Sequence, residues 1–260
     1  MSVALNGRVT GTGKPLIILH GLFGSMENLG AIAKRLEDQW QIHALDQRNH
    51  GRSPHSDVMD YPAMAADVIA YMDAQGLSSA AILGHSMGGK TAMQVALTYP
   101  DRVDHLIVAD IAPVTYKPRH DAILEGMTAI DPSGFKSRQE ADVALAHYVE
   151  MPGVRQFLLK NLERIPTGES GAGGFRWRIN VPVIEACYPN LAAAPEGDAF
   201  DGPTLFIKGA DSAYIQDKHR DEIARLFPKA ELQIIEGTGH WLHAEQPDRF
   251  AELCRNFLAD

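Results

Sequence analysis

The stretch GHSMGGKT, from Gly84 to Thr91, satisfies two motifs that belong to different folds. Read as G-x-S-x-G, it predicts a tight turn between a strand and a helix that exposes Ser86 as a nucleophile. Read as G-x-x-x-x-G-K-S/T, it predicts a P-loop, whose backbone N–H groups and Lys90 hold nucleotide phosphates. The rest of the chain must decide between a covalent hydrolase site and a nucleotide site.

Short apolar segments alternate with helical patterns along most of the sequence. A helix is predicted over residues 62–76, because proline stands at its start and glycine at its end. Nearly continuous apolar runs are typical of strands in a parallel sheet that helices cover on both faces. The sequence therefore predicts an α/β fold with a mostly parallel sheet flanked by helices. The predicted strands are PLIILH (15–20), QIHALD (41–46), AAILGH (80–85), HLIVAD (105–110), TLFIKG (204–209) and ELQIIEG (231–237).

The alternation stops after residue 112, and no strong core strand follows before Thr204. Two segments in between, QEADVALAHYVE (139–150) and GVRQFLLKNLER (153–164), have the apolar spacing of helices. The glycine-rich GESGAGGF (168–175) is predicted to be a loop. This part of the chain is therefore expected to form a mostly helical insertion over the sheet.

We accordingly predict one core domain built from residues 1–112 and 202–260. Residues 113–201 are expected to form a helical cap, inserted after the strand that ends at Asp110 and belonging to the same structural unit. At 260 residues the chain is long enough for such a core to be buried without disulfides.

The loop at 84–91 can be judged by what each interpretation explains. Asp110 ends the strand that follows, where a P-loop protein has the aspartate that holds Mg²⁺. The P-loop, however, gives no role to three stretches that follow predicted strands. The elbow explains the glycines, because Cβ atoms on Gly84 and Gly88 would collide around a strained serine, and Gly89 lets the helix pack near the strand. We therefore favour the elbow. The three stretches are HGLFG (20–24), DQRNHGRSP (46–54) and GTGHWLHAEQP (237–247).

Composition excludes several classes of function. The net charge of −9 disfavours nucleic acid and anionic membranes as partners. The two cysteines, Cys187 and Cys254, lie in no zinc-binding pattern, and we expect buried free thiols. The first residues lack the pattern of a secretory leader, and no apolar run approaches the roughly 20 residues that span a bilayer. A cytoplasmic location without membrane attachment is expected.

Motifs spread over almost the whole chain together resemble the α/β-hydrolase superfamily. RNHG and GGK narrow the resemblance to the esterases and acyl thioesterases that include the bacterial esterase YbfF and the mammalian abhydrolase-11 proteins. The resemblance implies an α/β-hydrolase fold with a cap, and a serine esterase that acts on a small acyl ester or thioester, acyl-CoA among the candidates, without cofactor or metal. The motifs are HGLFGSMENLG, DQRNHGRSP, YPAMAADV, GHSMGGKTAM, DIAPV, FRWRINVPV and GHWLHAEQPD.

The same resemblance implies roles for individual residues. Ser86 is expected to be the nucleophile and His240 the general base, and the chain order Ser, Asp, His matches the order expected of this fold. The backbone N–H groups of Leu22 and Met87 are expected to form the oxyanion hole. Their side chains matter little for this role, because the donors belong to the main chain.

The aspartate that orients His240 has two candidates. Many relatives place it after the penultimate strand as G-x-x-D, but here KGADSAY puts Ser212 at that position and Asp211 one residue early. Asp110, 24 residues after Ser86, offers the position that other relatives use. We favour Asp110 over Asp211 and expect Ser212 to support the triad by a hydrogen bond.

Other histidines and charged residues in these motifs are expected to be structural. His20, His50 and His85 should orient loops by hydrogen bonds to the backbone. His243, three residues after His240, should lie on a helical turn and point elsewhere. Asp46 and Arg48 are expected to form a structural pair that supports the elbow.

Sequence patterns within the predicted cap indicate function less specifically. Trp177 lies between Arg176 and Arg178. This alternation of aromatic and charged residues predicts a short extended segment in which the tryptophan is packed and the arginines are solvated. A second hypothesis has these arginines bind an anionic leaving group such as the phosphates of coenzyme A. Apolar cap residues would then line an acyl pocket. The residues considered for it are Phe157, Leu158 and Tyr188.

Alternative functions remain open at this stage. Lactonase or C–C bond hydrolase activity is compatible with the same fold, because the fold does not determine the substrate. Two remote alternatives are a P-loop nucleotide-binding protein and a hydrolase-fold receptor without catalysis. The oligomeric state has no signature in the sequence.

Overall fold

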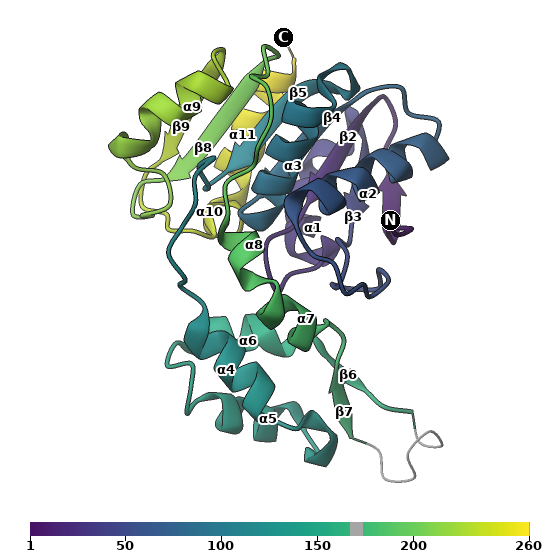
Figure 1. The fold of residues 1–260 in the computed structure, drawn as a ribbon, viewed down its shortest axis with the longest axis vertical. Helices are drawn as coiled ribbons and strands as arrows, with labels where there is room; N and C mark the ends of the chain where they lie inside the picture. The colour runs from purple at the N-terminus through teal and green to yellow at the C-terminus, as the bar shows by residue number, and fades with distance from the viewer. Residues whose placement is uncertain (167–173, 260) are drawn as a thin grey trace.

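The computed structural model describes residues 1–166 and 174–259. Strands and helices alternate along both ends of the chain, and a mostly helical segment separates them (Figure 1). The main sheet contains, in chain order, β1 (Gly7–Thr10), β2 (Lys14–Leu19), β3 (Trp40–Leu45), β4 (Ala80–His85), β5 (Val103–Ala109), β8 (Thr204–Gly209) and β9 (Ala230–Ile235).

The spatial order of the strands is β1-β3-β2-β4-β5-β8-β9. Every neighbouring pair is parallel except β1 with β3, which is antiparallel. The six strands predicted from apolar runs are confirmed to within about two residues at either end. The sequence prediction missed β1, because this edge strand is only four residues long and mostly exposed.

Helices cover both faces of the sheet, as predicted. Successive side chains of a strand point to opposite faces, so Ile17 and Leu19 pack against one layer of helices and Leu16 and Ile18 against the other. In Figure 1, α2, α3 and α9 lie in front of the sheet, with α1 and α11 behind it. The helices of these layers are α1 (Gly30–Leu36), α2 (Tyr61–Ala74), α3 (Met87–Thr98), α9 (Arg220–Leu226), α10 (Leu242–Glu245) and α11 (Pro247–Leu258).

The predicted helix at 62–76 is α2, and its ends show why it forms there. The Asp60 side chain accepts the backbone N–H of Ala63 at 2.8 Å, which caps the first turn. Pro62 lies in that turn, where its missing N–H costs nothing. Gly76 follows the helix with φ +69°, a conformation in which glycine is not strained.

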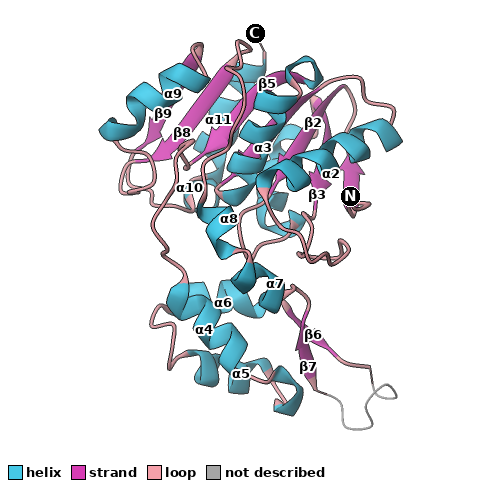
Figure 2. Ribbon diagram, viewed as in Figure 1, coloured by secondary structure: helices cyan, strands magenta, loops and turns pink. Residues whose placement is uncertain are grey.

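The elements between β5 and β8, which we call the cap, lie beyond the carboxyl ends of the strands (Figure 2). One apolar cluster joins core residues such as Met59 and Met87 to cap residues such as Leu145 and Ile184. The cap therefore packs directly on the elbow. Its elements are α4 (Asp121–Ala129), α5 (Arg138–Leu145), α6 (Pro152–Leu159), β6 (Leu162–Arg164), β7 (Phe175–Trp177), α7 (Val181–Ala186) and α8 (Tyr188–Ala192).

Two predictions for the cap need correction or qualification. The segment at 153–164 is not helical throughout, because α6 ends at Leu159 and β6 then pairs antiparallel with β7. Cross-strand pairing with a distant segment is invisible to a local apolar pattern. The glycine-rich segment predicted as a loop lies outside the described residues, apart from its last two positions.

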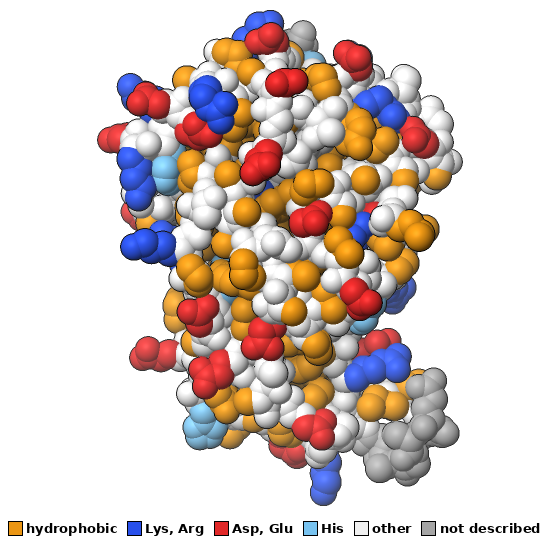
Figure 3. Space-filling model, in the orientation of Figure 1, with side chains coloured by type: hydrophobic (Ala, Val, Ile, Leu, Met, Phe, Trp, Pro, Cys, Tyr) orange, Lys and Arg blue, Asp and Glu red, His pale blue; other side chains and the backbone are white. Residues whose placement is uncertain are grey.

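The two cysteines differ in burial. Both thiols are free, and Cys254 is buried in α11, but Cys187 is only partly buried, contrary to the prediction. Cys187 directly follows α7, and its thiol donates to the carbonyl oxygen of Asp57 at 3.8 Å. Among the described helices, none combines the length and the apolar character needed to cross a bilayer. Figure 3 shows acidic and basic side chains interspersed over core and cap on the visible face.

Candidate active site

Ser86 occupies a strained turn between β4 and α3. Its backbone angles are φ +54° and ψ −118°, a conformation that residues other than glycine rarely adopt. The neighbouring glycines make the turn feasible. A Cβ on Gly84 would lie 2.1 Å from the carbonyl oxygen of Gly88, and one on Gly88 would lie 2.3 Å from that of Leu19. The turn has the geometry of a nucleophile elbow.

Lys90 and Thr91 lie in the first turns of α3, and both side chains are engaged by the protein. Lys90 Nζ donates to the carbonyl oxygens of Ala192 at 2.9 Å and Ala193 at 2.5 Å. Thr91 Oγ1 donates to Gln47 Oε1 at 2.7 Å. The P-loop interpretation is therefore wrong, because the lysine that would hold a phosphate binds carbonyl oxygens at the end of α8. In the part of the chain that the structure describes, no group of three or more His, Cys, Asp or Glu side chains is arranged to hold a metal ion.

Three side chains from separate loops meet beside the elbow. Asp110 directly follows β5, and His240 lies in the loop between β9 and α10. Ser86 Oγ is 3.0 Å from His240 Nε2, and His240 Nδ1 is 2.7 Å from Asp110 Oδ2. With Nδ1–H donating to the carboxylate, Nε2 is left to accept the serine proton.

Asp110, rather than Asp211, contacts His240. Asp110 is fully buried and has a positive φ of +52°, which directs its side chain across the end of the sheet. Its Oδ2 also accepts the Ser212 hydroxyl, and its Oδ1 accepts the Gly209 N–H at 3.2 Å. Asp211 is exposed. The departure from the G-x-x-D pattern is thus explained, since Ser212 stands where the common acid would be and binds the carboxylate that comes from β5.

The two N–H groups predicted for the oxyanion hole border Ser86. Met87 is the first residue of α3, so its N–H has no acceptor within the helix. Leu22 belongs to the turn after β2, which lies close to the elbow: a Cβ on Gly21 would be 3.3 Å from Ser86 Cβ. The assignment of these donors to an oxyanion stays a prediction.

Buried histidines hold the turn at 20–24 in place. His20 Nδ1 donates to the carbonyl of Gly21 at 2.8 Å, and His50 Nε2 accepts the N–H of Phe23 at 3.1 Å. Burial lowers the pKa of His20, and it lowers the pKa of His50 to about 3. Both rings are therefore neutral near pH 7 and can act as hydrogen-bond acceptors. They orient loops through the backbone, as predicted.

Asp46 and Arg48 do not pair with each other, so this prediction is wrong. Arg48 instead makes two hydrogen bonds to Asp67 on α2, at 2.6 and 2.8 Å, and both side chains are at most 1% exposed. Asp46 accepts the backbone N–H groups of Met26 at 2.8 Å and Arg52 at 2.9 Å. Both residues are structural, but the partner of Arg48 is 19 residues away in sequence and is brought there by the fold.

His85 contacts His240, and His243 contacts His85 on its other side. His85 Nε2 donates to the backbone oxygen of His240 at 2.8 Å, and its ring centroid is 4.8 Å from that of His240. The ring of His243 on α10 lies 4.3 Å from that of His85. Burial, followed by the nearby His240, lowers the pKa of His243 to about 4. His85 thus orients the loop that carries His240, and His243 lies on a helical turn, as predicted.

Tyr214 is a site residue that the sequence analysis missed. Its ring stacks on that of His240, with centroids 4.1 Å apart and an angle of 25° between the planes. The Arg119 guanidinium lies 5.0 Å from the centroid of the same ring. An aromatic residue two positions after Ser212 was the available signal, but the stacking depends on how the loop after β8 folds back toward the loop after β9.

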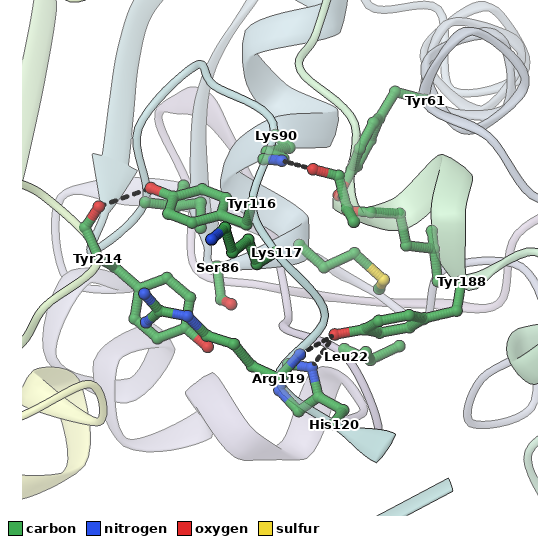
Figure 4. Close-up of a pocket in the computed structure, with 14 residues that line it drawn as sticks. Leu22, Tyr61, Ser86, Lys90, Tyr116, Lys117, Arg119, His120, Tyr188 and Tyr214 are labelled. Atoms are coloured by element: carbon green, nitrogen blue, oxygen red, sulfur yellow. Dashed lines mark hydrogen bonds between the residues drawn. The ribbon is translucent and has the colours of Figure 1, made fainter. Parts of the chain in front are cut away.

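Ser86 opens onto a small cavity, which we call the inner cavity (Figure 4). Its volume is about 50 Å³. Buried side chains form much of its wall, among them Tyr61, Lys90 and Leu191. Burial lowers the pKa of Lys90 to about 7. In the view of Figure 4, Lys90 lies on one side of Ser86 and His120 on the other.

Ser86 also borders a larger depression, which we call the outer groove. Its volume is about 430 Å³. His240 lines this groove, together with Phe157 and Trp241, whose ring centroids are 5.6 Å apart. His240 is absent from the described walls of the inner cavity. Ser86 and His240 therefore lie at the junction of two spaces that differ in size.

The three cap residues predicted to line one acyl pocket are separated in the structure. Phe157 lines the outer groove and Tyr188 the inner cavity, whereas Leu158 is fully buried in the apolar cluster of the cap. The prediction is wrong for Leu158 because neighbouring side chains on a helix point about 100° apart.

The residues around Trp177 form the predicted extended segment, which is β7. Trp177 is partly buried, and its Nε1 donates to the carbonyl of Met127 at 3.1 Å. Arg176 lies 3.3 Å from Glu163 on the exposed face of the hairpin. Neither Arg176 nor Arg178 lines the inner cavity or the outer groove, so the hypothesis that they bind an anionic leaving group is not supported.

Comparisons with known proteins agree with this geometry. Residues 14–145 match the family described as alpha/beta hydrolase fold. The chain is 42% identical to "Esterase YbfF" of Escherichia coli strain K12, over 95% of this chain and 93% of that protein. It is 38% identical to "sn-1-specific diacylglycerol lipase ABHD11" of Mus musculus, over 94% of this chain and 80% of that protein.

A solved structure is similar over the same extent. "Marine microorganism esterase" superimposes with a TM-score of 0.94 and 44% identity, over 98% of this chain and 100% of that one. The similarity thus includes the cap as well as the sheet. With a strained serine elbow, a mostly parallel sheet and these matches across its length, the chain belongs to the α/β hydrolase fold family.

Proposed function

We propose that the protein is a serine hydrolase that cleaves carboxylic esters or acyl thioesters of short to medium chain length through an acyl-enzyme on Ser86. One observation carries the proposal: Ser86 Oγ lies 3.0 Å from His240 Nε2, and His240 Nδ1 lies 2.7 Å from the buried Asp110. This arrangement supports the roles of nucleophile, general base and orienting carboxylate. The names of the relatives, an esterase and a diacylglycerol lipase, support an ester as the bond cleaved.

The proposed reaction follows from the hydrogen bonds. His240 Nε2 takes the proton of Ser86 as Oγ attacks the carbonyl carbon, and Asp110 stabilises the imidazolium that forms. The bond to the leaving oxygen or sulfur then breaks, and His240 gives that atom its proton. Water, activated by His240, releases the acid from Ser86 in the second half of the reaction. No cofactor or metal ion takes part.

Main-chain donors and a second serine complete the proposed machinery. The N–H groups of Leu22 and Met87 bind the oxyanion, and one such donor is typically worth about 2.7–4 kcal/mol of transition-state stabilisation. Ser212 keeps the Asp110 carboxylate oriented toward His240, a role supported by its hydrogen bond to Oδ2. We further propose that residues 113–201 act as a cap in one structural unit with the core, which the shared apolar cluster supports.

The test is hydrolysis of p-nitrophenyl acetate in EDTA by the wild type and by Ser86→Ala. We expect kcat to fall by about 10⁶ in the variant, as when the nucleophile is removed from a comparable triad. A fluorophosphonate should label the wild type at Ser86 and leave the variant unlabelled in mass spectrometry. Equal rates in the two proteins, or labelling elsewhere, would overturn the proposal.

A further inference from the structure

Ser86 lies where the inner cavity and the outer groove meet, and a substrate held there must place its two halves in different spaces. The carbonyl carbon is bonded to Ser86 Oγ during the reaction, with the acyl chain on one side and the leaving group on the other. Leu22, Ser86 and His120 border both spaces. The residues that line each space therefore indicate which half of the substrate binds there.

The position of His240 determines which of the two spaces the acyl chain and the leaving group each occupy. In the proposed function, on which this inference rests, His240 Nε2 must protonate the leaving oxygen or sulfur atom. His240 lines the outer groove and is absent from the described walls of the inner cavity. We infer that the leaving group occupies the outer groove and that the acyl chain occupies the inner cavity, so that the enzyme selects esters of short acids with bulky leaving groups.

The inner cavity sets the length of the acyl chain. One water needs at least about 10–15 Å³, so a volume of about 50 Å³ holds at most roughly three to five groups of that size. Acetyl and butyryl chains, with one and three carbons beyond the carbonyl, fit this space. An octanoyl chain, with seven, exceeds it.

The far wall of the inner cavity is fixed by hydrogen bonds. The Tyr61 hydroxyl donates to the carbonyl of Leu191 at 2.7 Å, and Lys90 Nζ donates to the carbonyl of Ala192 at 2.9 Å. Tyr61 and Lys90 are 3% and 1% exposed. A longer chain would have to displace buried groups from these bonds, each of which leaves an unpaired polar atom behind.

The outer groove has room for a bulky leaving group. Its volume is about 430 Å³ against about 50 Å³ for the inner cavity, and its aromatic pair Phe157 and Trp241 is only partly buried. Flat apolar leaving groups can pack on such rings with little loss of conformational freedom in the protein. Selectivity for the leaving group is therefore set by the cap helix α6 and the loop that carries His240.

The test measures kcat/KM for p-nitrophenyl acetate, butyrate, octanoate and palmitate, with the leaving group held constant. In the wild type we expect octanoate to react at least about tenfold more slowly than butyrate. Leu191→Ala should raise the octanoate-to-butyrate ratio by about tenfold, because it lengthens the cavity and leaves the carbonyl that Tyr61 binds in place. Leu191→Val, a smaller change for the case in which the alanine variant does not fold, should shift the ratio in the same direction.

Phe157→Ala is the matched variant in the outer groove. It should keep the octanoate-to-butyrate ratio of the wild type and lower the preference for 2-naphthyl acetate over ethyl acetate. A ratio near one in the wild type, or a ratio changed by Phe157→Ala and unchanged in both Leu191 variants, would overturn the inference. Hydrolysis of p-nitrophenyl acetate that still requires Ser86 would leave the proposed function standing in that event.

Discussion

The core and the cap hold their parts of the candidate site by different interactions. Beneath the elbow, charged and polar side chains such as Arg48, Asp67 and His50 are fully buried and hydrogen bonded. The cap contributes mainly apolar packing, with Leu158 and Ile184 at its centre, while its pair Arg176 and Glu163 is about half exposed. Directional bonds position the reacting atoms, whereas packing shapes the spaces around them and tolerates change more readily.

The largest effect is expected for Asp110, the carboxylate that directly follows β5. Asp110→Asn should lower kcat by about 10⁴, because the amide no longer holds His240 in the tautomer that accepts the serine proton. Asp211→Asn, in an exposed neighbour, is the control and should retain activity close to that of the wild type. Ester hydrolysis measured for both variants checks this, and a larger loss in the control would assign the acid to the loop after β8.

Buried and exposed ion pairs should differ strongly in their effect on stability. Asp67→Ala leaves the buried Arg48 guanidinium without its carboxylate and should lower the free energy of unfolding by about 3–5 kcal/mol. Glu163→Ala in the cap should cost about 1 kcal/mol or less, because its partner is solvated. Urea unfolding of the two variants measures both losses. Similar losses would show that the buried pair in the core and the exposed pair in the cap contribute equally to stability.

The neutral histidines of the core should make stability depend on pH. Burial lowers the pKa of His50 from 6.5 to about 3. Below pH 6.5 the unfolded chain therefore binds a proton that the folded protein does not, so the free energy of unfolding falls as the pH falls from 6.5 toward 3. The expected slope is about 1.4 kcal/mol per pH unit for this group.

His50→Gln isolates that contribution. The glutamine carbonyl can still accept the N–H of Phe23 but does not titrate, so the variant should lose stability less steeply between pH 7 and 5. Urea unfolding at pH 7, 6 and 5 measures the two slopes. If they coincide, His50 is protonated in the folded protein or takes up no proton in the unfolded one.

The smallest effect is expected at a single polar contact within the cap. Trp177→Phe keeps an aromatic ring but removes the hydrogen bond from Nε1 to the carbonyl of Met127. The free energy of unfolding should fall by about 1 kcal/mol. A loss above 3 kcal/mol in urea unfolding would show that the cap depends on polar contacts as strongly as the core does.

Sequence patterns predicted the features that arise from local chemistry. Six strands of the sheet are nearly continuous apolar runs, and the elbow has glycines where the backbone approaches itself, so both are visible without tertiary information. The exposed strand β1 has no apolar run, and β6 exists only through pairing with β7. These two elements were missed for that reason.

Contacts between distant segments were harder to predict. The positions of Ser86, His240 and Asp110 followed from motifs and chain order, and the structure brings these three together. The true partner of Arg48 and the stacking of Tyr214 on His240 depend on how loops and helices meet in space. The local sequence around Arg48 does not identify its partner, and the position of Tyr214 two residues after Ser212 does not by itself predict stacking on His240.

The positive φ angles of Ser86 and Asp110 have a consequence for how such a chain can change over time. Each angle is a conformation that typically costs about 1–3 kcal/mol for a residue with a side chain, and glycine would relieve it. At these two positions, then, the most stable sequence and the reactive sequence differ. Under the proposed function, glycine at either position would exchange reactivity for relief of backbone strain, so stability and hydrolysis make opposite demands on the same two residues.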